Sequence, residues 1–248
     1  MTGGYRSDLA YIHDVGFGNF AREAAPFLVK LIQANEKHPP THPSRLVVDL
    51  GCGSGIWAQE LCGDGYRVLG IDLSPAMIDL ARKRVPQAEF RGGSFLSIDI
   101  PSCAAVTAIG EIFSYCFDEH NTRPALSKLF RRIHEALEPR GLLIFDVAAP
   151  GRVPGKGEHR SFREGEDWAV LLEAKEDKKH KLLTRRITSF RRVGEFHRRN
   201  YEVHRLRLFE RAEIAQLLRR EGFRVRTLDG YGRLRFARGH IGFIARKS

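Results

Sequence analysis

The chain has 248 residues, of which 42% are hydrophobic and 29% charged, a balance that excludes a largely disordered chain. Its 41 lysines and arginines against 30 aspartates and glutamates give a formal net charge of +11. The four cysteines form no CxxC pair and have no metal-ligand spacing, which argues against a disulfide framework and a zinc site. No apolar run reaches the roughly 18 residues of a membrane span, and the first residues do not resemble a secretory signal. We expect a cytoplasmic protein without a membrane partner.

The net charge is unevenly distributed along the chain. Residues 1–150 contain 15 basic and 17 acidic residues, whereas residues 151–248 contain 26 and 13. A strongly basic half is compatible with nucleic-acid binding. It is equally compatible with arginines on solvated strand faces that resist edge-to-edge pairing. Charge alone leaves both alternatives open.

The first half alternates strand-like and helix-like segments, as in a parallel sheet covered by helices. Apolar residues recur with helical spacing over Phe20–Ala34 and again from Leu126 to Leu137, and Ser74-Pro75 starts a helix over Ala76–Arg84. The expected strands are Arg45–Leu50, Arg67–Asp72, Ala88–Arg91, Ala105–Ile109 and Gly141–Val147. This order predicts an α/β, doubly wound fold.

The character of the sequence changes after Pro150. A glycine- and proline-rich connector, Gly151–Gly157, leads to three expected antiparallel strands, Trp168–Glu176, Leu182–Val193 and Phe196–Phe209. The apolar face of the third switches between Val203 and Leu206, which predicts a bulge or bend there. A helix over Glu210–Glu221 then precedes two strands, Phe223–Leu228 and His240–Ala245, whose loop connection predicts antiparallel pairing.

The most specific motif is the glycine loop of residues 47–55, VVDLGCGSG, between a strand and a helix. It matches neither the dinucleotide pattern G-x-G-x-x-G, because position 56 is Ile, nor a P-loop. It reads D-x-G-x-G-x-G, and the acidic Asp49 favours a ligand with cationic groups. Asp72 ends the next strand, where a carboxylate can accept both hydroxyls of a ribose.

This loop, together with Asp72, resembles the cofactor site of class I S-adenosylmethionine-dependent methyltransferases. The resemblance covers most of the chain and implies a seven-stranded, Rossmann-like sheet with an antiparallel last strand. It implies that Asp72 holds the ribose and that Ser94, where the family often has Asp, borders the adenine. The other cofactor residues that it implies are Gly51, Cys52, Gly53 and Gly55 at the methionine part and Leu73, Met77 and Phe95 at the adenine.

A narrower resemblance, to amino-sugar N-methyltransferases and more distantly to glycine N-methyltransferase, begins at Gly16-Phe17-Gly18-Asn19-Phe20-Ala21-Arg22. It implies an N-terminal lid in which Phe20 and Arg22 reach the cofactor, Arg22 at its carboxylate. Glu202-Val203-His204 matches a sheet that those enzymes insert after the fifth strand. We therefore expect three parts: residues 1–150 as lid and cofactor-binding half, 151–209 as inserted substrate-covering sheet, and 210–248 completing the α/β domain.

Candidate acceptor-side groups follow the fourth strand. Tyr115 stands where the amino-sugar enzymes have a histidine, and a tyrosine of ordinary pKa is a poor base, although it can orient an amine. His120 and His204 are alternative bases, each with a structural alternative as a surface or cross-strand residue. Glu111 is expected to face a cation near the cofactor, or to be a simple loop residue.

Three functions remain open at this point. The first is methyl transfer to a small-molecule acceptor, most simply an amine nitrogen, by in-line displacement. The second is RNA methylation by the basic half, although no flipped-base clamp of the Asn/Asp-Pro-Pro-aromatic type follows the fourth strand. The third is cofactor binding without catalysis. The inserted sheet is also a candidate surface for a homodimer.

Overall fold

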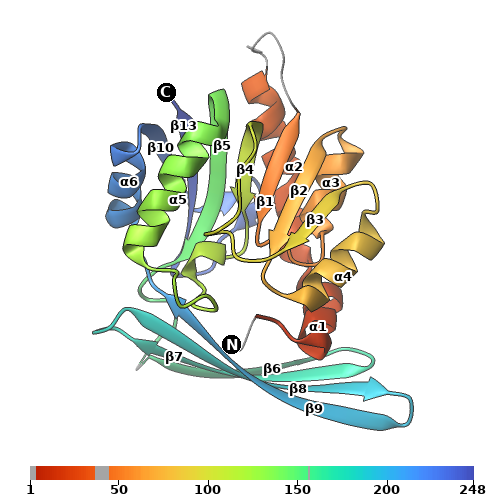
Figure 1. Cartoon of the computed structure of the whole chain (residues 1–248). Coiled ribbons are helices and arrows are strands. Elements are labelled where there is room, and N and C mark those ends of the chain that lie inside the picture. Colours follow the sequence, from red (N-terminus) through yellow and green to blue (C-terminus); the bar gives the residue numbers. More distant parts are fainter. Residues whose placement is uncertain (1–3, 37–44, 156) are drawn as a thin grey trace.

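The computed structural model describes residues 4–36, 45–155 and 157–248, and its centre is a seven-stranded sheet (Figure 1). The strand order is β10-β13-β5-β4-β1-β2-β3, and β13 runs antiparallel to both of its neighbours. The strands are β1 (Leu46–Leu50), β2 (Arg67–Asp72), β3 (Glu89–Gly92), β4 (Cys103–Ala108), β5 (Leu137–Ala148), β10 (Phe223–Leu228) and β13 (His240–Lys247). The doubly wound sheet and its antiparallel last strand are as predicted.

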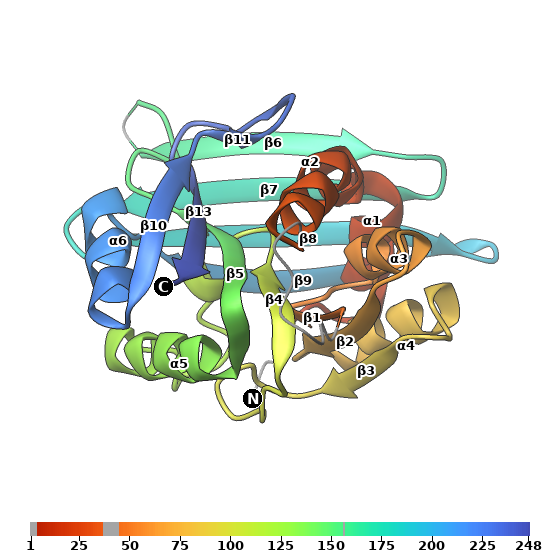
Figure 2. The same ribbon diagram turned by 90° about the horizontal axis from the view of Figure 1, so that it is seen from above.

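Two groups of helices cover the two faces of this sheet (Figure 2). On one face lie α5 (Arg123–Ala136) and α6 (Arg211–Arg220), and on the other α2 (Asn19–Glu36), α3 (Ile56–Gly63) and α4 (Pro75–Arg84). Helix α4 begins as its sequence predicts, since the Ser74 side chain accepts a hydrogen bond from a backbone amide and Pro75 follows it. Helix α5 begins three residues before the predicted apolar pattern, at a cap formed by Thr122. Buried aliphatic and aromatic residues fill both interfaces.

A separate antiparallel sheet is inserted after β5. Its order is β6 (Glu158–Glu164), β7 (Trp168–Asp177), β8 (Leu182–Val193) and β9 (Phe196–Arg207). We expected three strands, and β6 is the one that the sequence does not reveal. All residues of β6 are exposed. Because no face of the strand is buried, its sequence lacks the alternation of apolar and polar residues that indicates a strand, and it resembles a charged loop.

The predicted bulge in β9 was wrong. The register between β8 and β9 is unbroken from Leu182–Arg207 to Val193–Phe196. The buried face of β9 continues in strict alternation, but two of its members are polar, Glu202 and His204, while apolar Val203 is exposed. When buried positions are polar, the sequence pattern suggests that the buried face has switched although it has not. Here the polar residue His204 is buried because it lines a cavity.

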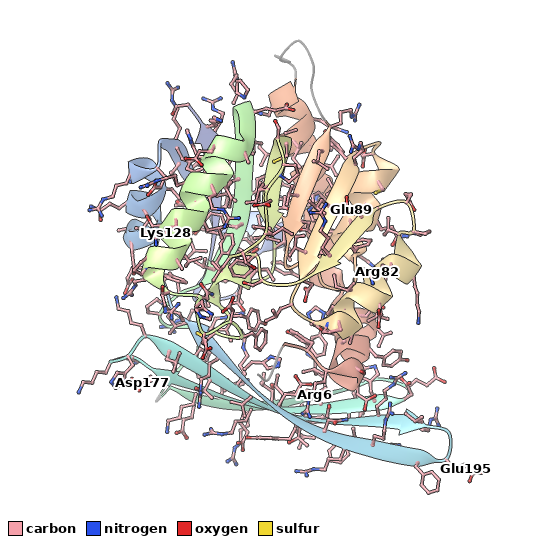
Figure 3. All side chains as sticks on the ribbon, in the orientation of Figure 1. Arg6, Arg82, Glu89, Lys128, Asp177 and Glu195 are labelled. Atoms are coloured by element: carbon pink, nitrogen blue, oxygen red, sulfur yellow. The ribbon has the colours of Figure 1, made fainter. Side chains whose placement is uncertain are left out.

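The carboxyl ends of the parallel strands point toward the inserted sheet, and α1 (Ser7–Phe17) lies between the two layers (Figure 1). Figure 3 shows Arg6 in this space, with Asp177 and Glu195 at opposite ends of the inserted sheet. The 229–239 connection, expected as a loop, contains the short hairpin of β11 (Gly230–Tyr231) and β12 (Leu234–Arg235). None of the described helices combines the length and apolar character needed to cross a membrane.

Candidate active site

Two adjoining cavities lie between the carboxyl edge of the main sheet and the inserted sheet. The smaller has a volume of about 70 Å³ and the larger about 610 Å³. The residues that line both are Tyr5, Gly51, Asp72, Ile112 and Tyr115. The Tyr5 and Tyr115 hydroxyls are 3.1 Å apart, so this pair stands at the junction of the cavities.

The glycine loop forms one wall and requires its glycines for two different reasons. A Cβ on Gly51 would come within 2.5 Å of Ile112, at a φ of +69° that only glycine adopts easily. A Cβ on Gly53, at a φ of +53°, would have no atom within 4 Å, and Gly53 lines the larger cavity, so its backbone is open to a ligand. Gly55 was expected beside the cofactor, but a Cβ there would instead lie 3.1 Å from Ala81 of α4.

Asp72 lines both cavities, and each of its carboxylate oxygens accepts a hydrogen bond from a different backbone amide. Its Oδ2 accepts from the Gly53 amide at 2.9 Å, and its Oδ1 accepts from the Ser74 amide at 2.8 Å. Burial raises the pKa of this carboxyl despite these hydrogen bonds. Each oxygen keeps a second lone pair, so the group fits a ligand with two adjacent hydroxyls, such as a ribose.

The smaller cavity is lined mainly by apolar side chains, as suits the faces of an aromatic base. Leu73 and Phe95 line it with Ser94, whose hydroxyl donates to the Asp118 carboxylate. Asp118 lines the same cavity and also accepts from the His120 amide. Sequence reasoning found Ser94 in place of the family's usual Asp, and it missed that a carboxylate 24 residues later is hydrogen-bonded to that serine.

Asp49 is a second buried carboxyl at the cavity wall. The Oδ1 of Asp49 accepts a hydrogen bond from the Thr107 hydroxyl at 2.7 Å. The Thr107 oxygen in turn accepts one from the Trp57 indole at 3.1 Å. Burial raises the pKa of Asp49 to about 7, and the Thr107 hydrogen bond opposes this only partly. A carboxyl of this kind is stabilised in its ionised form by a nearby cation.

The loop after β4 is held by a buried aspartate on β5. Asp146 accepts from the backbone amides of Gly110 and Glu111, from the Tyr231 hydroxyl at 2.9 Å and from His240 at 2.6 Å. It thereby fixes Glu111 in the left-handed region, at a φ of +63°. The sequence analysis did not identify Asp146; the signal that could have done so is a single aspartate within the apolar segment Leu142–Val147.

Glu111 faces cations, which is one of the two alternatives predicted for it, and these cations are arginine side chains of the protein itself. Its carboxylate lies 2.8 Å from Arg185 Nη2 and 3.0 Å from Arg152 Nε. Burial would raise the pKa of Glu111, but Arg185 and Arg152 outweigh it and hold the pKa at about 2. Glu111 is therefore an anion that keeps two arginines at the wall of the larger cavity.

His204 enters the same cavity from β9. Its Nε2 is 3.0 Å from Glu202 Oε2, and its buried Nδ1 has no hydrogen-bond partner among the described residues. Because Glu202 requires a donor, Nε2 carries the proton and Nδ1 keeps a lone pair. Tyr5, Tyr115 and Phe117 surround the imidazole. An imidazole whose Nδ1 lone pair is free can accept a proton from a ligand.

Most of the residues predicted for the site line these cavities, and three do not: Gly55, described above, Arg22 and His120. Those around the larger cavity are Phe20, Gly51, Cys52, Gly53, Asp72, Met77, Glu111, Tyr115 and His204. Arg22 is exposed on α2 and lines neither cavity, and its contact with the cofactor carboxylate stays a prediction. His120 is 81% exposed and pairs with Asp118, because it lies on the outer side of the loop before α5.

The sequence of the chain is similar to known methyltransferases. Residues 47–141 match the family model of a methyltransferase domain. A putative methyltransferase, YqeM of Bacillus subtilis, is 25% identical over 183 residues, which cover 72% of this chain and 73% of that protein. Malonyl-[acyl-carrier protein] O-methyltransferase of Serratia marcescens is 28% identical over 127 residues, 51% of this chain and 47% of that enzyme. The chain thus spans only about half the length of the second relative.

Solved structures match over almost the whole chain. An S-adenosylmethionine-dependent methyltransferase from Clostridium acetobutylicum has a TM-score of 0.80 at 19% identity, covering 97% of this chain and 98% of the other. CalS10, an amino pentose methyltransferase from Micromonospora echinaspora solved with S-adenosylmethionine bound, has a TM-score of 0.72 at 19% identity, covering 100% and 99%. At these identities the likeness establishes the fold, and it includes the inserted sheet.

Proposed function

Because this chain belongs to the class I S-adenosylmethionine-dependent methyltransferases, we propose that it transfers the methyl group to a small molecule whose accepting atom is an amine nitrogen. S-adenosylmethionine supplies an electrophilic methyl group on a positively charged sulfur. The amine requires a free lone pair, and the protein must hold it in line with that group.

One observation carries the proposal: carboxylates and glycine backbone line one side of the cavities, and a histidine with a free lone pair lines the other. On the cofactor side, Asp72 would accept the two ribose hydroxyls and Asp118 the adenine amine. Asp49 would favour the positive charge of the methionine part. Leu73 and Phe95 would provide apolar contacts to the adenine, whereas Met77, predicted at the adenine, lines only the larger cavity. The smaller cavity suits the base, and the larger suits the methionine part together with the acceptor.

On the acceptor side, His204 would be the general base. Glu202 would keep its Nε2 protonated, so that Nδ1 removes the proton that an ammonium group must lose before it attacks. Tyr115 would orient the amine through its hydroxyl, which also contacts Tyr5 and Arg185. A carboxylate oxygen, the acceptor type of an O-methyltransferase acting on acids, carries no proton to remove. The buried histidine therefore favours an amine over a carboxylate as the methylated group.

The test combines cofactor binding with a methyl-transfer screen of amines, amino sugars, phenols and RNA. Asp72→Ala should weaken S-adenosylmethionine binding in calorimetry by tenfold or more, since two hydrogen bonds to an ionised group are lost. His204→Asn should keep cofactor affinity within twofold and reduce kcat by about a hundredfold, the lower range for a general base.

His180→Asn is the matched control, because that histidine is exposed, pairs with Asp177 at the turn between β7 and β8 and lines neither cavity; it should leave both measurements unchanged. Cofactor binding with no transfer to any acceptor would favour a binding protein without catalysis. Unchanged cofactor affinity in Asp72→Ala would contradict the proposed site.

A further inference from the structure

Resting on the proposed function, we infer that the methyl acceptor carries an anionic group, a carboxylate or a phosphoryl group, and that Arg185 and Arg152 bind it. The acceptor is then an amine that is also an acid. Neither arginine was among the predicted site residues, and both reach the cavity from elements outside the glycine loop, Arg185 from β8 and Arg152 from the connector after β5.

The charges around the larger cavity are segregated. The carboxyls of the glycine-loop side are Asp49 and Asp72, whereas the inserted-sheet side contributes two of the four arginines in the lining; the other two and Glu111 come from the segments after β4 and β5 and from the β11–β12 hairpin. These four arginines are Arg152, Arg163, Arg185 and Arg235. Arg163 and Arg235 are exposed at the rim, while Arg152 and Arg185 are only 20% and 17% exposed. The two sides therefore suit ligand parts of opposite charge.

Arg152 and Arg185 together carry two positive charges, and Glu111, the carboxylate that both contact, carries one negative charge. One positive charge of the pair is therefore not balanced by Glu111. Asp146, which lies beneath the loop, is already surrounded by two backbone amides, Tyr231 and His240. Burying a charge without a counter-ion is costly, and a ligand anion removes that cost.

The arginines also have hydrogen-bonding capacity to offer. Arg185 donates through Nη2 to Glu111 and through Nη1, at 3.4 Å, to Tyr115, out of five N–H groups. Arg152 donates through Nη1 to the Arg238 carbonyl, and its buried Nε makes no hydrogen bond within the described residues although it lies 3.0 Å from Glu111. An ion pair without a well-oriented hydrogen bond leaves the guanidinium free to reorient toward a planar or tetrahedral anion.

The position of the pair relates the anion to the reaction. Arg185 contacts the hydroxyl of Tyr115, which stands at the junction of the two cavities near His204. An anion on Arg185 would thus hold the rest of the acceptor beside Tyr115 and the imidazole. An uncharged amine lacks this contact and would not be fixed in that orientation, which makes the arginines determinants of specificity.

The first experiment measures anion binding rather than turnover. Malonate and inorganic phosphate are titrated separately, by calorimetry, into protein saturated with S-adenosylhomocysteine. We expect saturable binding of at least one of them, which also distinguishes a carboxylate site from a phosphate site. Arg185→Gln should weaken that binding by tenfold or more. Arg186→Gln, which changes the next residue on the outer face of β8, should change it less than twofold.

The second experiment compares matched amines as methyl acceptors and ligands: glycine with glycinamide, and glucosamine 6-phosphate with glucosamine. The acidic member of a pair should bind at least tenfold more tightly, and Arg185→Gln should abolish the difference. Arg185→Lys keeps a charge beside Glu111 but loses the planar fork; it should retain S-adenosylhomocysteine affinity, which reports folding, and lose most of the discrimination.

Three outcomes would overturn the inference. One is binding of neither anion to the wild-type protein, and another is equal loss of binding in Arg185→Gln and Arg186→Gln. The third is that Arg185→Gln weakens S-adenosylhomocysteine but not 5′-methylthioadenosine, because the arginine would then hold the cofactor's own carboxylate. The proposed function fails separately, if no amine accepts a methyl group or the cofactor does not bind.

Discussion

At the scale of single residues, burial gives Asp49 a property that its place in the glycine motif does not reveal. With a pKa of about 7, raised by burial, the carboxyl is about half protonated at neutral pH. The positive charge of S-adenosylmethionine favours the ionised form, so binding below that pH must release a proton. His13, which lines the same cavity, has its pKa lowered by burial to about 4 and does not titrate in this window.

We predict that cofactor affinity falls as pH decreases below about 7, with a limiting slope of about tenfold per pH unit for one proton. Calorimetry between about pH 5.5 and 8.5, in buffers of different ionisation enthalpy, measures both the affinity and the proton release. Asp49→Asn should remove most of the slope, and any remainder would report Asp72, whose pKa is also raised by burial. A flat profile in the wild-type protein would contradict the assignment.

At the scale of elements, α1 fastens the inserted sheet to the cofactor-binding side. Asp8, near its start, accepts from Arg198 at 2.5 Å, Arg191 at 3.2 Å and Asn200 at 2.7 Å. Asp14, at the other end, accepts from the Ser54 hydroxyl and from Arg84. One short helix thus forms charged contacts with both layers that enclose the cavities.

Asp8→Ala should lower stability by about 1–3 kcal/mol, less than for a fully buried ion pair because Arg191 and Arg198 are partly exposed. For a chain of this size that corresponds to a decrease in Tm of roughly 2–12 °C. Proteolysis at the β8–β9 hairpin should also accelerate. Glu173→Ala, which removes an exposed pair with Arg160, is the control and should shift Tm by less than about 2 °C. Equal shifts in the two variants would show that α1 does not fasten the sheet.

At the scale of the whole molecule, eight of the 26 lysines and arginines in residues 151–248 form ion pairs within the part of the chain that the structure describes. Arg185 and Arg152 pair with Glu111, and Arg191 and Arg198 pair with Asp8. Further pairs are Arg160–Glu173, Lys175–Glu158, Lys181–Glu210 and Arg211–Asp229. The homodimer through the inserted sheet stays a prediction; the outer face of that sheet exposes Phe162, Leu171 and Tyr201.

We predict that bulk RNA binds weakly and accepts no methyl group, because no clamp for a flipped base follows the fourth strand and the two inner arginines of the cavity, Arg152 and Arg185, already pair with Glu111. Affinity measured at about 50 and 200 mM salt should decline by far less than the ~10³-fold typical of six or more phosphate contacts. A steep decline together with radiolabelled methyl groups in RNA would instead support the RNA methyltransferase alternative.

The sequence determined by itself the features that depend on local pattern. Strand runs, helix caps and the D-x-G-x-G-x-G loop with Asp72 predict the doubly wound sheet and the side on which the cofactor binds, because periodicity and backbone geometry are local properties. The antiparallel last strand also follows, since its connection is too short for a helical crossover.

Tertiary structure decided what depends on neighbours distant in the chain. Strand β6 escapes prediction because it buries no side chain, and β9 was misread because its buried face is polar. The partners Ser94–Asp118, Asp146–Glu111 and Arg185–Glu111 are 24 to 74 residues apart, so no spacing rule connects them. The basic excess belongs to the same category: only the fold shows that two of its arginines lie within the cavity, where their charge is available to a ligand.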